Sequence, residues 1–284
     1  MTDSTRTSPV TLHDVAREAG VSLATASRSL NGSTRNVKAA NRERVLEAAQ
    51  RLGYSANASA QAVARGTSTT VALLVGDISD PYFSSIAAGV VGAAEDNHLI
   101  VTMAETRRDP EREVELVRTL RGQRPRAIIL AASRRAADPH AEALHRELTT
   151  FEADGGRVVF ISTANAPFRT LGLDNHGGAK ALGAALGELG YRRVAVLAGP
   201  DGDHGKPGLR TAADRLDGFI AGLAEHGVSV ESDRIVWTAF TRDGGYEGME
   251  RLLRAGIDGI DLVFAVNDVM AVGAMSALRD AGLE

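Results

Sequence analysis

The 284-residue sequence has no cysteine and no apolar run long enough to cross a bilayer. Without cysteine, the chain cannot form disulfides, thiolate metal sites or a cysteine nucleophile. Without a run of ~20 apolar residues, we expect no transmembrane helix. Residues 1–6 are polar and no apolar segment follows them, so we expect no Sec-type signal peptide. These absences predict a cytoplasmic protein with no membrane partner.

Sequence signatures of common enzyme classes are also missing. The loop at residues 76–81 reads Gly-Asp-Ile-Ser-Asp-Pro, which lacks the Gly-x-Gly-x-x-Gly pattern of a dinucleotide site. There is no Walker loop, no Gly-x-Ser-x-Gly elbow and no His-Glu-x-x-His pattern. His140 and His145 are five residues apart, off register for one helical face, which favours surface positions. We therefore predict no enzyme activity, no catalytic residue, no metal site and no cofactor.

Charge is distributed unevenly along a chain of otherwise globular composition. Apolar residues make up 44% and charged residues 24% of the sequence, and the length allows one large domain or two smaller ones. Residues 1–66 hold nine Lys and Arg against five Asp and Glu, whereas the remainder holds 23 against 31. A basic N-terminal segment followed by an acidic remainder is typical of a nucleic-acid-binding protein. Chance is the alternative, because so short a stretch easily reaches a charge of +4.

Short helical patterns fill residues 11–66. Three apolar faces follow one another along this stretch, and Gly20 and Gly53 interrupt the helices as expected helix stops. The residues on these faces are Val15, Ala16 and Ala19, then Ala26 and Leu30, then Val45, Leu46, Ala49 and Leu52. The pattern predicts a small domain of three short helices.

From residue 70 onward, short apolar runs alternate with amphipathic helical patterns. The runs lie at residues 71–75, 100–104, 127–131, 158–161, 194–197, 235–237 and 262–266. Two helix starts are marked by a capping aspartate followed by proline, at Asp109 and at Asp138. Strands that alternate with helices predict parallel sheets built from βαβ units. The polar stretch at residues 162–170 is a plausible crossover between two lobes.

The most specific motif covers residues 10–31. It predicts a helix, a turn at Gly20 and a second helix capped by Ser22. The second helix would project Leu23, Ala24, Thr25, Ser27 and Arg28 from its start, a geometry that fits the DNA major groove. Arg28 can bond a guanine in bidentate fashion, and Leu23 can contact a thymine methyl. A helical hairpin with no role in DNA binding is the alternative.

This segment resembles the head of the LacI-type (lactose/purine repressor, LacI/GalR) family of bacterial transcriptional regulators. Similar motifs continue at residues 41–45, 52–54, 75–83, 173–175, 215–219 and 266–271. The resemblance implies an N-terminal three-helix helix-turn-helix head on an α/β two-lobed periplasmic-binding-protein-like body of doubly wound parallel sheets. We expect the head at residues 1–54, a hinge at 55–68, and lobes at 69–163 and 164–284. Because the family continues with a further strand and loop, we also expect a C-terminally incomplete body.

By this resemblance, the hinge folds on operator DNA and Val63 wedges into the minor groove. The family usually has leucine at that position, a proline where Ala56 stands, and a serine cap where Lys38 stands. The expected DNA contacts are Thr11, Leu12, Ser22, Leu23, Ala24, Thr25, Ser27, Arg28, Asn31, Tyr54, Asn57, Ala60 and Val63. The charges of Arg35, Lys38, Arg42, Arg44 and Arg51 either contact phosphates or are simply solvated.

A second group of residues follows the predicted strands at their carboxyl ends, where ligands of doubly wound sheets bind. These residues are Asp80, Tyr82, Phe83, Phe240, Asn267 and Asp268, together with Arg215 on the helix after the loop at residues 198–200. The family resemblance implies that the best effector contacts are Phe83, Phe240, Arg215, Asn267 and Asp268. Aromatic rings cover the apolar face of a sugar while charged groups bind its hydroxyl pairs. The sequence therefore predicts a sugar-like effector between the lobes. The structural alternatives are a turn at Asp80 and helix caps at Asp174 and Asp268.

Together these patterns predict a sequence-specific transcriptional regulator, acting as a repressor. It would bind double-stranded palindromic operator DNA as a homodimer under the control of a small polar effector. A sugar-binding transport receptor is the main alternative, but it would need export and would leave the head unexplained.

The wedge interpretation makes a direct prediction. The change Val63→Leu should tighten operator binding, because a larger wedge recovers more of the few kcal/mol that unstacking a base step costs. Titration of operator DNA with each protein measures the difference. Unchanged or weaker binding would contradict the assignment of Val63.

Overall fold

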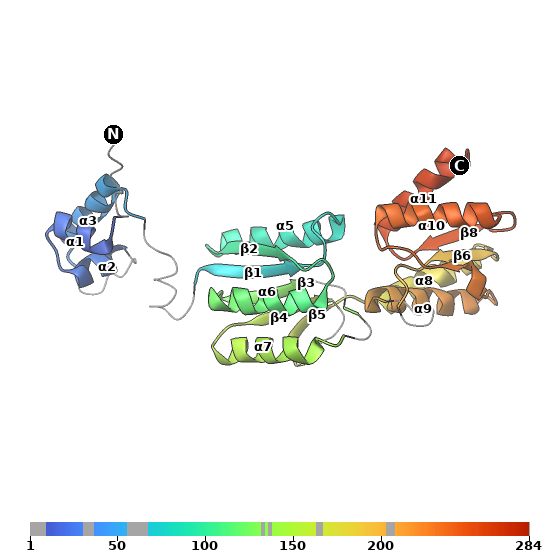
Figure 1. The fold of residues 1–284 in the computed structure, drawn as a ribbon, viewed down its shortest axis with the longest axis horizontal. Helices are drawn as coiled ribbons and strands as arrows, with labels where there is room; N and C mark the ends of the chain where they lie inside the picture. Colours follow the sequence, from blue (N-terminus) through green and yellow to red (C-terminus); the bar gives the residue numbers. More distant parts are fainter. Residues whose placement is uncertain are drawn as a thin grey trace, which may run out of the picture. The chain divides into compact units, whose positions relative to one another are not determined.

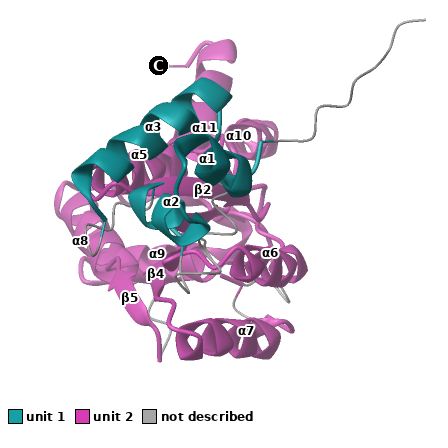
Figure 2. Cartoon of the chain, turned by 90° about the vertical axis from the view of Figure 1, so that its left-hand side faces the viewer, with its two compact units in different colours: residues 1–68 teal, residues 69–284 magenta. Residues whose placement is uncertain are grey.

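The computed structural model describes residues 10–30, 37–55, 68–131, 134–135, 138–162, 167–202 and 208–283. The chain forms two compact units, Met1–Ser68 and Thr69–Glu284 (Figure 2). Four of the expected DNA contacts lie outside the described residues, namely Asn31, Asn57, Ala60 and Val63. Within the described ranges, every helix is too short or too polar to span a bilayer.

The first unit contains the three predicted helices, α1 (Leu12–Ala19), α2 (Leu23–Leu30) and α3 (Ala39–Leu52). Their core is small, with Val15, Ala26, Val45 and Ala48 fully buried. The prediction that Leu46 belongs to this core is wrong, because its side chain is 48% exposed. Ala48 lies three residues after Val45 and therefore takes the core-facing position on α3.

The predicted cap at Ser22 and the predicted stops at Gly20 and Gly53 are present, and Thr11 adds a cap that was not predicted. Thr11 caps α1 in a reciprocal capping box with Asp14, and Ser22 accepts a hydrogen bond from the Thr25 backbone N–H at 3.2 Å. Gly20 and Gly53 end α1 and α3 in the left-handed conformation, with φ of 61° and 63°. These caps satisfy backbone groups that would otherwise lack partners at the helix ends, and so fix the turn between α1 and α2.

The second unit begins with a five-stranded parallel sheet in the order β2-β1-β3-β4-β5 (Figure 1). Its strands are β1 (Thr70–Val75), β2 (Ile100–Glu105), β3 (Ala127–Ala131), β4 (Val158–Ser162) and β5 (Arg169–Gly172). Strand β5 was not predicted from the sequence, because it is short and polar and pairs only with β4. The expected lobe boundary between residues 163 and 164 thus differs from the boundary of this sheet, which includes Gly172.

Helices cover both faces of this sheet, as a doubly wound fold requires. They are α5 (Pro81–Asp96), α6 (Pro110–Gly122) and α7 (Ala141–Ala153). Alternate residues of β1 point to opposite faces, so Leu73 and Val75 pack with α5 whereas Ala72 and Leu74 pack with α6 and α7. Helix α7 begins at Ala141, not directly after Asp138 as predicted, because Asp138 instead accepts the His140 backbone N–H in a turn.

The second sheet has three parallel strands in the order β7-β6-β8. They are β6 (Val194–Leu197), β7 (Ile235–Val236) and β8 (Leu262–Ala265), and the 3-10 helix Ser232–Arg234 precedes β7. Four helices pack with this sheet, namely α8 (Asn175–Glu188), α9 (Arg210–Ala224), α10 (Arg242–Ala255) and α11 (Asp268–Asp280). The core they share is centred on Leu197, Phe219, Met249 and Met270, all fully buried.

Helices α8 and α9 approach each other closely through glycines. A methyl group on Gly183 of α8 would lie 2.3 Å from the Phe219 carbonyl oxygen, and one on Gly222 of α9 would lie 2.0 Å from the Lys180 carbonyl oxygen. No side chain fits at those distances, so the backbones touch directly. The spacing of these two helices therefore depends on glycine at both positions.

This packing predicts a large difference between two glycines of one helix. The change Gly183→Ala should destabilise the second lobe by about 1–3 kcal/mol, as overpacking usually does. A methyl group on Gly178, also on α8, would meet no neighbouring atom within 4 Å, so Gly178→Ala should stabilise by roughly 0.5–1 kcal/mol. Urea unfolding followed by the fluorescence of Trp237, the single tryptophan, measures both. Equal stabilities would contradict this account of the interface.

Candidate functional site

A cavity of about 690 Å³ opens at the carboxyl ends of both sheets. Loops after β1, β7 and β8 contribute to its wall, together with α8 and α9. All seven residues predicted for ligand binding line it: Asp80, Tyr82, Phe83, Arg215, Phe240, Asn267 and Asp268. The size falls within the range of small-molecule sites, ~300–1,000 Å³.

The first lobe contributes aromatic rings at the start of α5. Asp80 caps this helix, since its Oδ1 accepts the Tyr82 backbone N–H at 3.0 Å, and Pro81 follows as the first helical residue. The rings of Tyr82 and Phe83 meet edge to face at 5.1 Å between centroids. Burial raises the pKa of Tyr82 above its ordinary value, although the positive charge of Arg215 acts in the opposite direction. Tyr82 is therefore a neutral donor at physiological pH.

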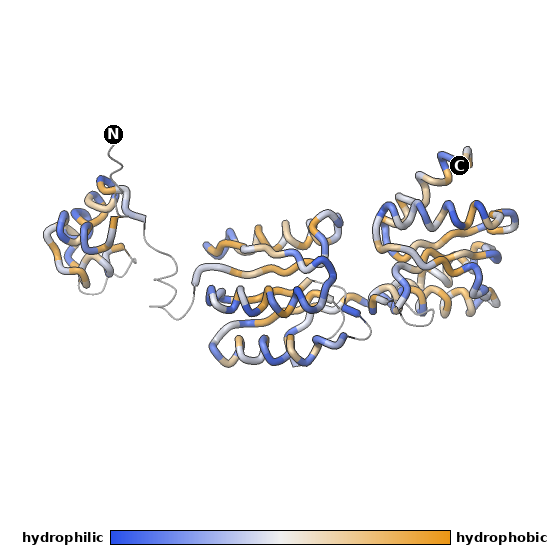
Figure 3. Tube along the Cα trace, viewed as in Figure 1, coloured by the Kyte–Doolittle hydropathy of each residue, from blue (hydrophilic) through white to orange (hydrophobic). Residues whose placement is uncertain are grey.

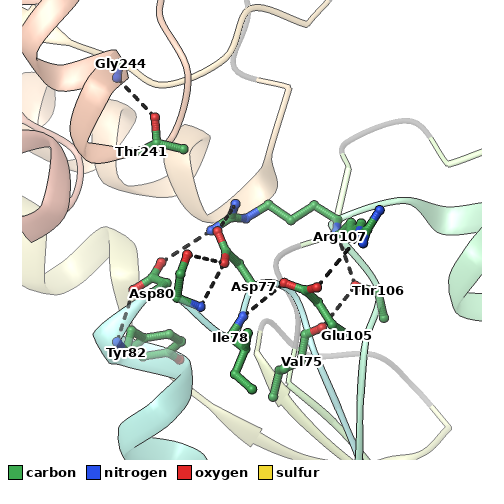
Figure 4. Close-up of polar contacts among 12 residues, drawn as sticks. Val75, Asp77, Ile78, Asp80, Tyr82, Glu105, Thr106, Arg107, Thr241 and Gly244 are labelled. Carbon is green, nitrogen blue, oxygen red and sulfur yellow. Dashed lines mark hydrogen bonds and ion pairs between the residues drawn. The ribbon is translucent and has the colours of Figure 1, made fainter.

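A network of charged residues lies beside this wall (Figure 4). Arg108 donates from Nη1 to Asp77 at 3.0 Å and from Nη2 to the Oδ2 of Asp80 at 3.3 Å. Desolvation raises the pKa of Asp77, but hydrogen bonds from Ser79 and the charge of Arg108 lower it below the usual value overall. Both oxygens of Asp80 are thus engaged, one by the helix and one by Arg108. Arg108 was not predicted as a site residue, because its Arg-Arg-Asp context is typical of a solvated loop.

The second lobe presents polar groups with unused bonding capacity. The Asn267 Oδ1 caps α11 by accepting the Met270 backbone N–H at 2.8 Å, so the cap is Asn267 and not Asp268. The Asn267 Nδ2 is buried without a hydrogen-bond partner among the described residues. Asp268 is exposed, with no hydrogen bond or ion pair to any described residue. An exposed acceptor therefore lies next to a buried donor that has no partner among the described residues.

Arg215 ties three segments of the second lobe together. From α9 its Nε donates to the Asn175 side-chain oxygen at 2.8 Å, and its Nη1 donates to the Val266 carbonyl oxygen at 2.8 Å. The remaining N–H groups can reach a ligand in the cavity. Asn175 also lines the cavity but was not among the predicted contacts, although it belongs to a motif noted in the sequence.

Two phenylalanines complete the wall of the second lobe. Gly199 has a φ of +83°, and a methyl group there would lie 2.9 Å from the Phe240 ring, so glycine makes room for this ring. Phe264, which was not predicted as a site residue, stacks on Phe219 at 3.9 Å. The cavity thus combines apolar ring faces with a few hydrogen-bonding groups, which suits a neutral polyhydroxylated ligand. Within the described ranges, no three His, Asp or Glu side chains are grouped to hold a metal ion.

The first unit has its own candidate surface on α2. This helix buries Ala26 and Ser29, half-buries Thr25 and Ser27, and exposes the other predicted residues at its start. The exposed residues are Ser22, Leu23, Ala24 and Arg28.

The other predicted DNA contacts described in the first unit also stabilise its fold. Leu12 and Tyr54 are half-buried against the head core, and Thr11 is occupied in its capping box. Arg28, in contrast, has no hydrogen bond or ion pair to another described residue.

The role of Arg215 predicts a loss of stability on a conservative change. Arg215→Lys should destabilise the second lobe by about 1.5–3 kcal/mol, because an ammonium group cannot bridge Asn175 and Val266 in a fixed fork. Arg210→Lys is the matched control, since Arg210 begins the same helix with an exposed side chain. Urea unfolding monitored by Trp237 fluorescence compares the two. If both variants have the same free energy of unfolding, the hydrogen bonds of Arg215 do not stabilise the lobe.

Comparisons with known proteins cover both units. Residues 11–57 match the family model of the bacterial regulatory proteins of the lacI family, and residues 71–284 match a periplasmic binding protein domain. The transcriptional regulator GalS of Salmonella typhimurium is 33% identical over 277 residues, which are 96% of this chain and 76% of the relative. Catabolite control protein A of Priestia megaterium is 30% identical over 96% of this chain and 79% of its own length.

Solved structures of transcriptional regulators also match this chain. A regulator of the same family from Silicibacter pomeroyi matches with a TM-score of 0.80 and 28% identity, over 97% of this chain and 79% of that one. The lac repressor dimer bound to operator and the anti-inducer ONPF matches with a TM-score of 0.76 and 25% identity, over 98% and 79%. A complex of the regulator CelR with cellobiose matches with a TM-score of 0.62 and 28% identity, over 97% and 79%. The chain therefore belongs to the lacI family of bacterial transcriptional regulators.

Proposed function

We propose that this chain is a repressor that reads operator DNA with α2 and releases or holds that DNA in response to a sugar bound in the cavity. The observation that carries the proposal is the convergence of seven predicted residues on one cavity, in a chain whose head exposes the start of α2. We place the head at residues 1–54, the hinge at 55–68 and the effector-binding body after them. As a regulator of transcription, it acts in the cytoplasm and has no catalytic role.

Base recognition rests on the exposed start of α2. Arg28 is exposed, and its guanidinium has the length and shape to bond the O6 and N7 atoms of a guanine in the major groove. Leu23 and Ala24 offer only apolar contact, which suits a thymine methyl group. Phosphate contacts from other basic residues of the head add affinity but no sequence information. The expected operator half-site therefore contains at least one guanine that Arg28 reads.

Homodimer formation is supported by an apolar surface at one edge of the first sheet. Val91 on α5 and Met103 on the edge strand β2 lie on the α5 side of the sheet and are exposed by 40% and 42%. Ile100, 65% exposed, points to the opposite face at the same edge. Figure 3 shows the hydrophobic colouring of these two adjacent elements. Exposed apolar surface of this kind favours burial against a partner. A second copy with the same surface gives a two-fold dimer, which matches a palindromic operator.

The effector acts through a coupling free energy between its own binding in the cavity and the binding of operator DNA. A sugar that contacts Phe240 and Asp268 in one lobe and Tyr82 in the other changes how the lobes sit together. That change alters the order of the hinges on DNA, and a coupling of ~1–3 kcal/mol changes operator affinity ~5–150-fold. The cellobiose complex of CelR supports a sugar as the effector class.

Selection of random duplex DNA on the purified protein tests this function. We expect one palindromic site to be enriched, with an affinity that falls steeply as salt rises, because phosphate contacts release counterions. Salt-sensitive binding without enrichment would contradict sequence-specific reading. Absence of binding even at low salt would favour a sugar receptor without a DNA target.

Two arginines of the head should behave differently on the selected operator. Arg28→Ala should weaken binding by about 1–3 kcal/mol and relax the preference at one base pair. Arg51→Ala removes a charge that pairs with Glu18 at 3.3 Å on α1, so at most it should weaken all sequences alike. Binding of a panel of single-base operator variants separates these outcomes. If Arg28→Ala keeps the full base preference, α2 is not the recognition helix.

A further inference from the structure

Arg108 reaches from the first lobe to the second. It lies in the loop between β2 and α6, and its guanidinium carbon is 5.9 Å from the ring centre of Phe83 and 5.8 Å from that of Phe240. Phe83 belongs to α5 of the first lobe, whereas Phe240 follows β7 of the second. We propose that Arg108 is a positioning residue, a clamp that holds the two lobes in one arrangement by joining the Asp77 and Asp80 carboxylates to the Phe240 ring.

The contacts of Arg108 differ from those of an ordinary surface ion pair. Its side chain is only 18% exposed, and it bonds two carboxylates that are 21% and 11% exposed. Screening by water is weak at such burial, so both the ion pairs and the attraction of the cation to ring faces gain strength. The Nε of Arg108 is buried without a partner among the described residues. One N–H group of the guanidinium thus has no described partner. The side chain is held by its ion pairs in the first lobe and by its ring contact in the second.

The backbone at this loop is strained, which points to the same function. Arg107 and Arg108 have φ values of +56° and +57°, in the left-handed region that non-glycine residues rarely adopt. Strain of this kind persists only where the surrounding contacts over-determine the conformation, and it is common at functional sites. Here the strained turn directs the Arg108 side chain back over the end of β1, whereas the Arg107 side chain remains 72% exposed.

The clamp also determines which lobe recognises the polar groups of a ligand. Arg108 and the α5 backbone each occupy one acceptor site on Asp80, so this carboxylate has a reduced capacity for the hydroxyl groups of a ligand. Polar recognition then falls mainly to Asn267, Asp268 and Arg215 of the second lobe, while the first lobe supplies rings and the Tyr82 hydroxyl. A ligand that moves Phe240 also moves the partner of Arg108. Ligand binding and the clamp are thereby linked through one ring.

A distance measurement between the lobes tests the clamp without any ligand or DNA. The chain has no cysteine, so Glu115→Cys on α6 and Glu247→Cys on α10, both exposed positions, accept spin labels selectively. Double electron–electron resonance, with labelled protein diluted in unlabelled protein, gives the distance distribution within one chain. We expect Arg108→Ala to broaden and shift this distribution, while the matched control Arg107→Ala leaves it unchanged.

Further variants distinguish a clamp from a local ion pair. Arg108→Lys keeps a charge near Asp77 and Asp80 but loses the flat group between the rings, so its distribution should be intermediate. Phe240→Leu should reproduce the Arg108→Ala distribution, and the double variant should add nothing further, because both changes break one link. If Arg108→Ala fails to fold, Phe240→Leu and Arg108→Lys still decide the question. A parent-like distribution in these variants, or an equal shift in Arg107→Ala, would overturn the proposal.

Operator binding gives a second readout that depends on the proposed function. In ligand-free protein, Arg108→Ala should change affinity for the selected operator at least about fivefold without altering base preference. Loss of base preference would mean a damaged head and would count against a clamp confined to the body. If no form binds DNA, the proposed function fails while the distance result still decides the clamp.

Discussion

The carboxyl ends of parallel strands lie at the same edge of a sheet, and the chemistry of this protein depends on that constraint. Residues after β1 in the first sheet, and after β7 and β8 in the second, are far apart in sequence, yet each follows the carboxyl end of a parallel strand. Both lobes are built in this way, and their two edges together border the cavity. A side chain placed directly after a strand therefore reaches the cavity even though no local sequence pattern specifies its partners.

The two lobes contribute unequal chemistry to this cavity. In the first lobe, the polar groups near the cavity bond mainly one another, as Asp77, Asp80 and Arg108 do. In the second lobe, a buried amide nitrogen of Asn267 and the carboxylate of Asp268 remain without partners among the described residues. An unpartnered buried donor is costly in a folded protein unless a ligand or water satisfies it. The arrangement thus favours a ligand whose hydroxyl groups face the second lobe and whose apolar face meets the rings of the first.

Much of the architecture could be predicted from local sequence because strong periodicity and capping signals coincide. The three head helices and seven of the strands follow from such signals, whereas the seven predicted cavity residues needed the family resemblance as well, and Asn175 and Phe264 were missed. β5 could not be predicted, since its residues Arg169 and Thr170 are polar and the strand exists only by pairing with β4. Leu46 was misplaced because Ala48 and Ala49, three and four residues after Val45, take the core-facing positions of α3 and leave Leu46 exposed. Arg108 was missed since its importance comes from two rings and two carboxylates that only the tertiary fold brings together.

The most direct test of the account is the thermodynamic coupling between cavity and operator. Affinity for the selected operator is measured while a panel of neutral mono- and disaccharides is titrated, and affinity for the active sugar is then measured with and without operator. The account predicts that one sugar changes operator affinity ~5–150-fold, and that operator changes the affinity for that sugar by the same factor, because binding linkage is reciprocal. A sugar that binds the cavity but leaves operator affinity unchanged would contradict the central claim.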